Sequence, residues 1–115
     1  MKRSLLHILA IAVAASMAAG CGGNTTGPSD PNSVSIRDNS FSPSSLSVSN
    51  GTTVTWRWNG STQHNVTWVV AGAPNSATQS AGTYARNFTS AGSYAYYCSI
   101  HGSPTSGMRG TVVVQ

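Results

Sequence analysis

The stretch that decides the fold is AGSYAYYCSIHGSPTSGMRGTVVV, residues 91–114. Tyr94, Tyr96 and Cys98 recur at every second position, and three valines near the end form a second run of β-forming residues. A period of two is typical of a strand with one buried face, and strands favour valine and tyrosine. The stretch therefore predicts two strands joined by a loop rich in Gly, Ser and Thr, with Cys98 on the inward face.

The same alternation recurs earlier in the chain, between turn signals such as Asn50-Gly51. The positions predicted to share inward faces are Leu46 and Val48, then Val54, Trp56 and Trp58, then His64, Val66, Trp68 and Val70. Asn65 and Thr67 are expected on the opposite face. Short strands at spacings of roughly 8–12 residues predict an all-β sandwich or barrel, and no stretch beyond the N-terminal segment has a helical period.

Residues 1–21 are predicted to be an export signal rather than part of the fold. Lys2 and Arg3 precede an apolar run and then small residues that end in AAGC at Cys21. This order is typical of a secretory signal, and its ending resembles a bacterial lipobox, in which Cys21 would be lipidated and begin the mature chain. Two alternatives stay open: ordinary signal cleavage shortly before Cys21, and a short anchor that is never cut.

The remaining chain divides into a tether and one domain. Residues 22–33, GGNTTGPSDPNS, have the composition of a flexible linker. Residues 34–115 are then the β domain, which is small enough that a bound metal would help to stabilise it. The formal net charge is +4, but two of the six basic residues belong to the signal. Without them four arginines stand against two aspartates, a balance of +2, and no basic run favours nucleic-acid binding.

Beyond residues 1–21 the chain has few side chains that bind soft metal ions. They are His64, Cys98, His101 and Met108. Two imidazoles and one thiolate in a trigonal plane, with a weak axial thioether, are the ligand set of a blue-copper electron-transfer site. Because His64 and Cys98 are both predicted on inward faces, we expect one shielded copper ion per chain at one end of the sandwich.

Structural zinc is an alternative for such a site, but it usually takes four strong ligands, often with paired cysteines. Only one cysteine remains after Cys21, the chain has no Glu, and Asp30 and Asp38 lie towards the tether side. Taken singly, Cys98 is also compatible with a buried structural thiol or with a disulfide to Cys21.

Three other functions compete with electron transfer. The chain is compatible with a periplasmic copper chaperone or store, although such sites are usually rich in Met or His. A metal-free adhesion sandwich is a second alternative. A fragment of a multicopper oxidase or nitrite reductase is a third, but those enzymes need a second copper centre with more histidines. The chain by itself is therefore not expected to be an enzyme.

Three segments resemble the cupredoxins, the small blue-copper proteins, and are most similar to the plastocyanin-like branch. They are FSPSSLSVSNGTTVTW (residues 41–56), QHNVTW (residues 63–68) and the stretch 91–114. The resemblance implies a Greek-key β-sandwich of about eight strands with copper at one end. Together with the export signal, it implies a monomeric lipoprotein of the periplasm, outer membrane or cell surface that passes electrons between redox partner proteins.

The resemblance also implies roles for individual residues. His64, Cys98 and His101 would form the trigonal plane, and Met108 would be the axial ligand. The backbone N–H of Asn65 would donate a hydrogen bond to the Cys98 sulfur. Six residues separate His101 from Met108, more than is usual in plastocyanins, so the strength of the axial bond stays open.

Two residues would be ports for electrons, again by resemblance. His101 would expose its ring edge within an apolar patch to which Ile100, Gly102 and Pro104 contribute. Tyr97, outward-facing and just before the cysteine, matches the position of a second port. No acidic patch is present, so the photosynthetic partner of plant plastocyanins is not expected.

Overall fold

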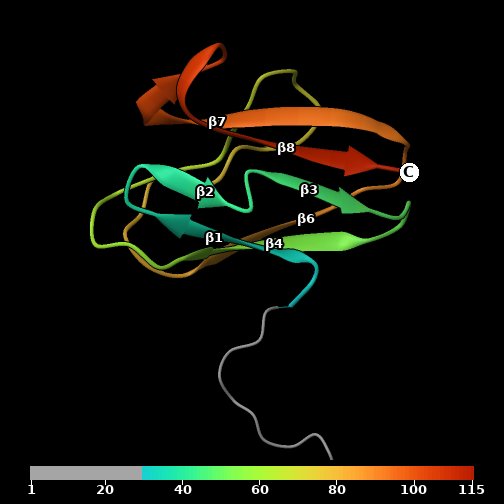
Figure 1. The fold of residues 1–115 in the computed structure, drawn as a ribbon, viewed down its shortest axis with the longest axis horizontal. Coiled ribbons are helices and arrows are strands. Elements are labelled where there is room, and N and C mark those ends of the chain that lie inside the picture. Colours follow the sequence, from blue (N-terminus) through green and yellow to red (C-terminus); the bar gives the residue numbers. More distant parts are fainter. Residues whose placement is uncertain (1–29) are drawn as a thin grey trace, which may run out of the picture.

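The computed structural model describes residues 30–115; the predicted signal, Cys21 and residues 22–29 of the predicted tether lie outside the described residues. Within this range the chain forms eight strands and no helix (Figure 1). The strands are β1 (Ser33–Arg37), β2 (Ser40–Ser42), β3 (Ser45–Val48), β4 (Thr53–Trp58), β5 (Thr67–Trp68), β6 (Thr83–Asn87), β7 (Gly92–Ser103) and β8 (Ser106–Val114). Among these residues there is accordingly no helix of a length and hydrophobicity that would span a membrane.

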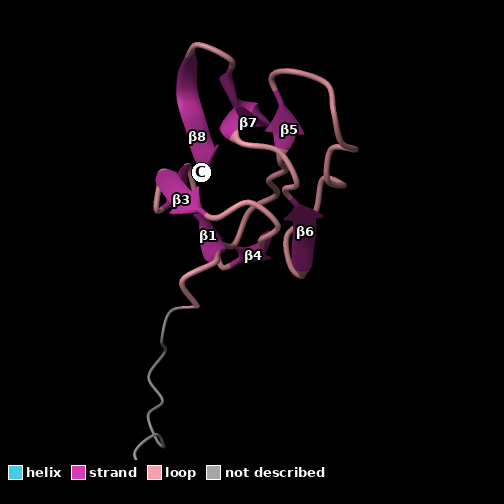
Figure 2. Cartoon of the chain, turned by 90° about the vertical axis from the view of Figure 1, so that its right-hand side faces the viewer, coloured by secondary structure: helices cyan, strands magenta, loops and turns pink. Residues whose placement is uncertain are grey.

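The strands form two four-stranded sheets, in the orders β2-β1-β4-β6 and β3-β8-β7-β5. Figure 2 shows β5, β7 and β8 in one layer, facing β1, β4 and β6 in the other. The pairs β1/β4 and β3/β8 are parallel, and the other neighbouring strands are antiparallel. The predicted all-β Greek-key sandwich of about eight strands is therefore confirmed.

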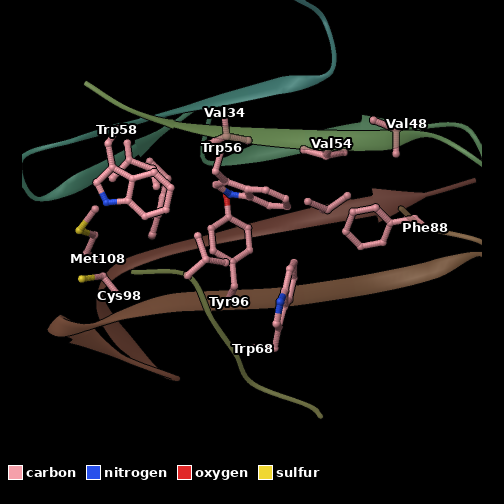
Figure 3. Packing of buried hydrophobic residues seen from close by; sticks show 14 of the residues in the cluster. Val34, Val48, Val54, Trp56, Trp58, Trp68, Phe88, Tyr96, Cys98 and Met108 are labelled. Atoms are coloured by element: carbon pink, nitrogen blue, oxygen red, sulfur yellow. The ribbon is translucent and has the colours of Figure 1, made fainter. Parts of the chain in front are cut away.

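The core between the sheets is built largely from aromatic rings. Trp56 of β4 is fully buried, and its ring centroid lies 5.6 Å from that of Trp68 and 5.4 Å from that of Tyr96, both edge to face (Figure 3). Edge-to-face pairs at this separation add to the stabilisation that burial of the rings supplies. The alternation predicted along β4 and β7 is confirmed by these buried positions.

The inward face predicted for the segment around β5 holds only in part. Trp68 is buried as predicted, but Val70 is 77% exposed, and Asn65, predicted on the opposite face, is only 4% exposed. The reason is that β5 contains only Thr67–Trp68. Outside those two residues the segment is not a strand, so a period of two does not describe where its side chains point.

The hairpin of β7 and β8 carries three of the four predicted ligands and is irregular at one place. The paired residues on either side of this irregularity are Tyr97 with Arg109 and Gly102 with Gly107. Between these pairs β7 contributes residues 98–101, whereas β8 contributes Met108 alone. A bulge re-aims the side chains of the longer strand, so Cys98 and His101 leave the regular ladder opposite Met108.

The long loop between His101 and Met108 is an ordered extension of this hairpin. Beyond the bulge the ladder resumes and ends at the pair Ser103 and Ser106, with residues 104–105 as the turn. The additional residues therefore lengthen the hairpin outward, at the upper left in Figure 1. These residues therefore do not separate Met108 from Cys98 and His101 across the hairpin.

Candidate metal centre

Three of the four predicted ligands converge at one end of the sandwich. One nitrogen each of His64 and His101 and the sulfur of Cys98 all lie within 4.8 Å of one another. The Cys98 Sγ is 3.9 Å from Nδ1 of His64 and 3.6 Å from Nδ1 of His101. Both histidines therefore present Nδ1 to the thiol. No second group of three or more such side chains is found within residues 30–115.

His64 is held by segments far from it in the sequence. Its backbone N–H donates to the Gln79 carbonyl at 3.0 Å, and its own carbonyl accepts the Gln79 N–H at 3.1 Å. The same carbonyl accepts the indole N–H of Trp58 at 3.1 Å. These contacts fix the main chain at His64, whose imidazole is fully buried.

The spacing of the donors suits a transition-metal ion. With nitrogen ligands at about 2.0–2.1 Å and sulfur at about 2.3 Å, trigonal angles place nitrogen and sulfur roughly 3.8 Å apart. The two observed nitrogen–sulfur distances, 3.6 and 3.9 Å, lie on either side of this value. Thiolate and imidazole donors favour copper over hard ions such as calcium or magnesium. The residues at this end therefore fit a copper ion.

Met108 lies at the same end of the core. It is 3% exposed and is the single β8 residue opposite the bulge. Figure 3 shows the sulfur atoms of Met108 and Cys98 at this end of the core, where Trp58 also lies. This placement fits the predicted axial position, although six residues separate Met108 from His101 in the sequence.

Asn65 links the two ligand-bearing segments through its side chain. Its Oδ1 accepts the backbone N–H of Ser99 at 2.9 Å, and its Nδ2 donates to the Ser99 hydroxyl at 2.8 Å. Since Asn65 follows His64 and Ser99 follows Cys98, these bonds hold one ligand segment against the other. The predicted bond from the Asn65 backbone N–H to the Cys98 sulfur is not among the hydrogen bonds of the described domain and stays a prediction.

One residue at the site, Asp38, carries no functional signal in the sequence. It lies between β1 and β2, and its Oδ1 is 3.1 Å from Nε2 of His64. Hydrogen bonds from His64, Thr62 and Ser61 hold the pKa of the Asp38 carboxyl well below its usual range. The carboxylate contacts the histidine nitrogen that faces away from Cys98, so Asp38 lies outside the group of candidate ligands.

The two predicted electron ports differ in what surrounds them. His101 is partly exposed, in contrast to His64 and Cys98, which are fully buried. Ile100 beside it is one of the few large apolar side chains of the described domain that lie exposed, at 48%. Tyr97 is also partly exposed and lies between Thr67 of β5 and Arg109 of β8 in the sheet.

Known proteins similar to this chain bind copper. A family model described as copper binding proteins of the plastocyanin/azurin family matches residues 30–115. Plastocyanin from Scenedesmus fuscus is 34% identical over 86 residues, which are 65% of this chain and 86% of that plastocyanin.

Solved structures of copper proteins are also similar to this chain. An amicyanin variant in its reduced Cu(I) form matches with a TM-score of 0.62 and 34% identity, over 72% of this chain and 80% of the amicyanin. A purple cupredoxin from Nitrosopumilus maritimus matches with a TM-score of 0.57 and 32% identity, over 65% of this chain and 81% of the cupredoxin. Together with the donor set at the end of the sandwich, these matches show that the chain belongs to the plastocyanin/azurin family of copper-binding proteins.

Proposed function

We propose that this chain carries single electrons between redox partner proteins of the cell envelope and does so with one copper ion. His64, Cys98 and His101 would hold the ion in a trigonal plane, and the Met108 thioether would be a weak axial ligand. Bound copper supplies one-electron chemistry between Cu(I) and Cu(II). The observation that carries the proposal is the convergence of two Nδ1 atoms and one thiol at a single end of the sandwich.

The burial of the donors supports electron transfer over copper handling. His64 and Cys98 are 0% exposed and Met108 is 3% exposed, whereas His101 is partly exposed. A protein that hands its metal to a partner needs several donors within that partner's reach. An electron carrier needs only one group at the surface, because electrons do not require the metal to leave. His101 is that group in our proposal.

The surroundings of His101 suit a partner that docks without strong charge attraction. Ile100 and the glycine and proline at positions 102 and 104 leave the end of the hairpin uncharged. Apolar contact can then bring a partner close to the imidazole edge, and the small net charge of the domain gives little long-range steering. Tyr97 is proposed as a second port, because it precedes Cys98 and its side chain is partly exposed.

We place this activity outside the cytoplasm. The signal-like residues 1–21 support export, and lipidation of Cys21 would attach the domain to a membrane through residues 22–33. A flexible linker lets a tethered monomer turn its copper end towards either of two partners.

Electron self-exchange tests the function directly. The full chain is loaded with copper, half of it is reduced, and exchange between Cu(I) and Cu(II) molecules is measured from NMR line broadening. Ile100→Lys should slow self-exchange by roughly tenfold, because each encounter of two copies would then bring two like charges together at the docking patch.

Val70→Lys is the matched control. Val70 is 77% exposed and follows β5. Its neighbour Val69 bonds to Ala95 near the start of β7, whereas His101 lies near the end of that strand. Val70→Lys should leave the exchange rate within about twofold of the wild type. Equal slowing by both variants would contradict docking at the His101 end. Very slow exchange in the wild type, with copper rapidly lost to a chelator, would favour copper handling instead.

A further inference from the structure

The Asp38 carboxylate is fixed in place by a turn that comes from another part of the chain. Its oxygens accept the backbone N–H of Ser61 at 2.9 Å and of Thr62 at 3.0 Å. They also accept both hydroxyls of these residues, each at 2.9 Å. A side chain at Gly60 would run into the Asp38 carboxylate and backbone, so glycine permits this close approach. The carboxylate is therefore positioned although 40% of its side-chain surface is exposed.

The fixed carboxylate meets the side of His64 that faces away from Cys98. Nε2 of His64 lies 3.1 Å from Asp38 Oδ1 and 3.0 Å from the Thr62 hydroxyl. Because the Thr62 hydroxyl donates to Asp38, its lone pairs are free to accept from the imidazole. A proton on Nε2 therefore has two acceptors, whereas an unprotonated Nε2 would place its lone pair against a carboxylate.

We propose that Asp38 is a positioning residue of the copper site: it holds the proton of His64 on Nε2 and so keeps the Nδ1 lone pair free for the metal. The proposal rests on the proposed function. It follows from the geometry, since Nδ1 is the nitrogen that faces Cys98 Sγ at 3.9 Å. When the second ring nitrogen of a histidine ligand donates a hydrogen bond to a carboxylate, the tautomer and the ring direction are fixed. The other nitrogen is then a stronger ligand for the metal.

The proposal has a consequence for the two oxidation states. A carboxylate bonded to the ligand increases the negative charge near the metal, and this favours the more highly charged Cu(II) over Cu(I). Removing the carboxylate should weaken the binding of both Cu(I) and Cu(II), and it should weaken the binding of Cu(II) more. The reduction potential should therefore rise, by about 59 mV for each tenfold difference between the two losses.

The alternative role for Asp38 is purely structural. In that role the carboxylate only joins the turn at residues 60–62 to β1, through its bonds to Ser61 and Thr62. Its loss would then lower the free energy of unfolding and leave the tautomer of His64 unchanged. The two roles differ in whether Asp38 decides which nitrogen of the His64 ring carries the proton. This can be measured without copper.

The first measurement is the tautomer of His64 in the copper-free full chain, by nitrogen-15 NMR near neutral pH. We expect Nε2 protonated and Nδ1 unprotonated in the wild type. Asp38→Asn should populate the opposite tautomer, because an amide can donate to Nε2. A wild-type His64 with its proton on Nδ1 would overturn the proposal, and this result does not depend on whether any variant folds.

The second measurement compares copper affinity and potential in Asp38→Asn and in Asp30→Asn. Asp30 is the matched control: it is the other aspartate of the described residues, and its carboxylate accepts the backbone N–H of Asn32 rather than contacting a histidine. Asp38→Asn should lose roughly 10–100-fold in Cu(II) affinity, less in Cu(I) affinity, and have a higher potential. Asp30→Asn should change each quantity less than twofold.

Equal shifts in the two variants would overturn the proposal, since they would reflect the loss of any negative charge. Ser61→Ala separates the structural role, because it removes one bond to Asp38 Oδ2 and leaves the contact of Oδ1 with His64. It should lower stability without moving the potential. Failure of the proposed function would show separately, as a wild type without a blue copper spectrum.

Discussion

At the copper end of the sandwich, hydrogen bonds from other parts of the chain hold His64 and the segment next to Cys98; at the far end, Arg86 lies among aromatic rings. The guanidinium carbon of Arg86 is 4.4 Å from the ring centroid of Trp68, and 4.7 and 5.0 Å from those of Phe88 and Tyr94. One of its nitrogens, Nη1, is buried without a hydrogen-bond partner among the described residues. For the Arg86 guanidinium, attraction to ring faces takes the place of hydrogen bonds.

This difference separates what holds the domain together from what it does. The Arg86 cluster stabilises the far end of the sandwich and includes none of the candidate ligands. Asn65 and Asp38 add little apolar surface to the core, but their hydrogen bonds position the segments and the ring that would bind the metal. Changes at the two ends should therefore have separable effects on stability and on the copper spectrum.

Gly102→Ala is the strongest way to break the copper end. A Cβ at this position would lie 2.5 Å from the backbone nitrogen and 2.7 Å from the carbonyl oxygen of Met108, so β8 must shift. We expect a loss of about 1–3 kcal/mol in the free energy of unfolding, from overpacking, and an altered copper spectrum. Chemical denaturation and visible spectroscopy measure the two effects.

Gly72→Ala is its control at the far end. The nearest atom to a Cβ there is Nη2 of Arg86, at an ordinary contact distance of 3.5 Å. Stability should change by less than about 0.5 kcal/mol and the copper spectrum should not change. Similar spectra for Gly102→Ala and the wild type would mean that Met108 does not influence the metal.

Arg86→Met breaks the far end while keeping an unbranched side chain. Removing the cation from the three ring faces should lower the free energy of unfolding by about 1 kcal/mol, since part of the loss is offset by relief of the unpartnered Nη1. The copper spectrum and potential should stay the same. Arg57→Met, at an exposed arginine of β4, should be nearly neutral in the same denaturation experiment. A changed spectrum in Arg86→Met would contradict the separation of the two ends.

Tyr96→Phe tests the middle of the core, between the two ends, and has the smallest expected effect on stability at neutral pH. The Tyr96 hydroxyl is buried without a hydrogen-bond partner among the described residues, and burial raises the pKa of Tyr96. Removing such a hydroxyl should change stability by less than about 1 kcal/mol.

The pH dependence of the same variant follows from the sign of that shift. A pKa that is higher in the folded state favours folding below the unfolded value of about 10 and opposes it above that value. The stability of the wild type relative to Tyr96→Phe should therefore fall as the pH rises above about 10. Denaturation curves between pH 7 and 11 measure this difference, and a constant difference would contradict the raised pKa.

The sequence is sufficient to predict the strands and the ligand set. Alternation along β4 and β7 predicts buried faces, because both strands are long enough to lie against the core over several residues. The ligands can be identified because few side chains of the domain bind soft metals, and because Cys98, His101 and Met108 lie in one hairpin.

The role of Asp38 cannot be predicted in this way. It depends on the parallel pairing of β1 with β4, in which Ile36 lies opposite Trp58. This pairing brings the end of β1 next to the turn at residues 60–62, and no local pattern specifies it. Asn65 and Val70 are misplaced by the alternation for a related reason, since β5 is too short to impose a period of two on its neighbours.

The central claim is tested most directly by the visible and EPR spectra of the Cu(II)-loaded protein, recorded beside those of Cys98→Ser. The account predicts an intense blue thiolate-to-copper band and a small hyperfine splitting in the wild type, both lost in the variant. A colourless protein with an ordinary tetragonal Cu(II) spectrum, unchanged in Cys98→Ser, would contradict it, because Cys98 would then not bind the metal.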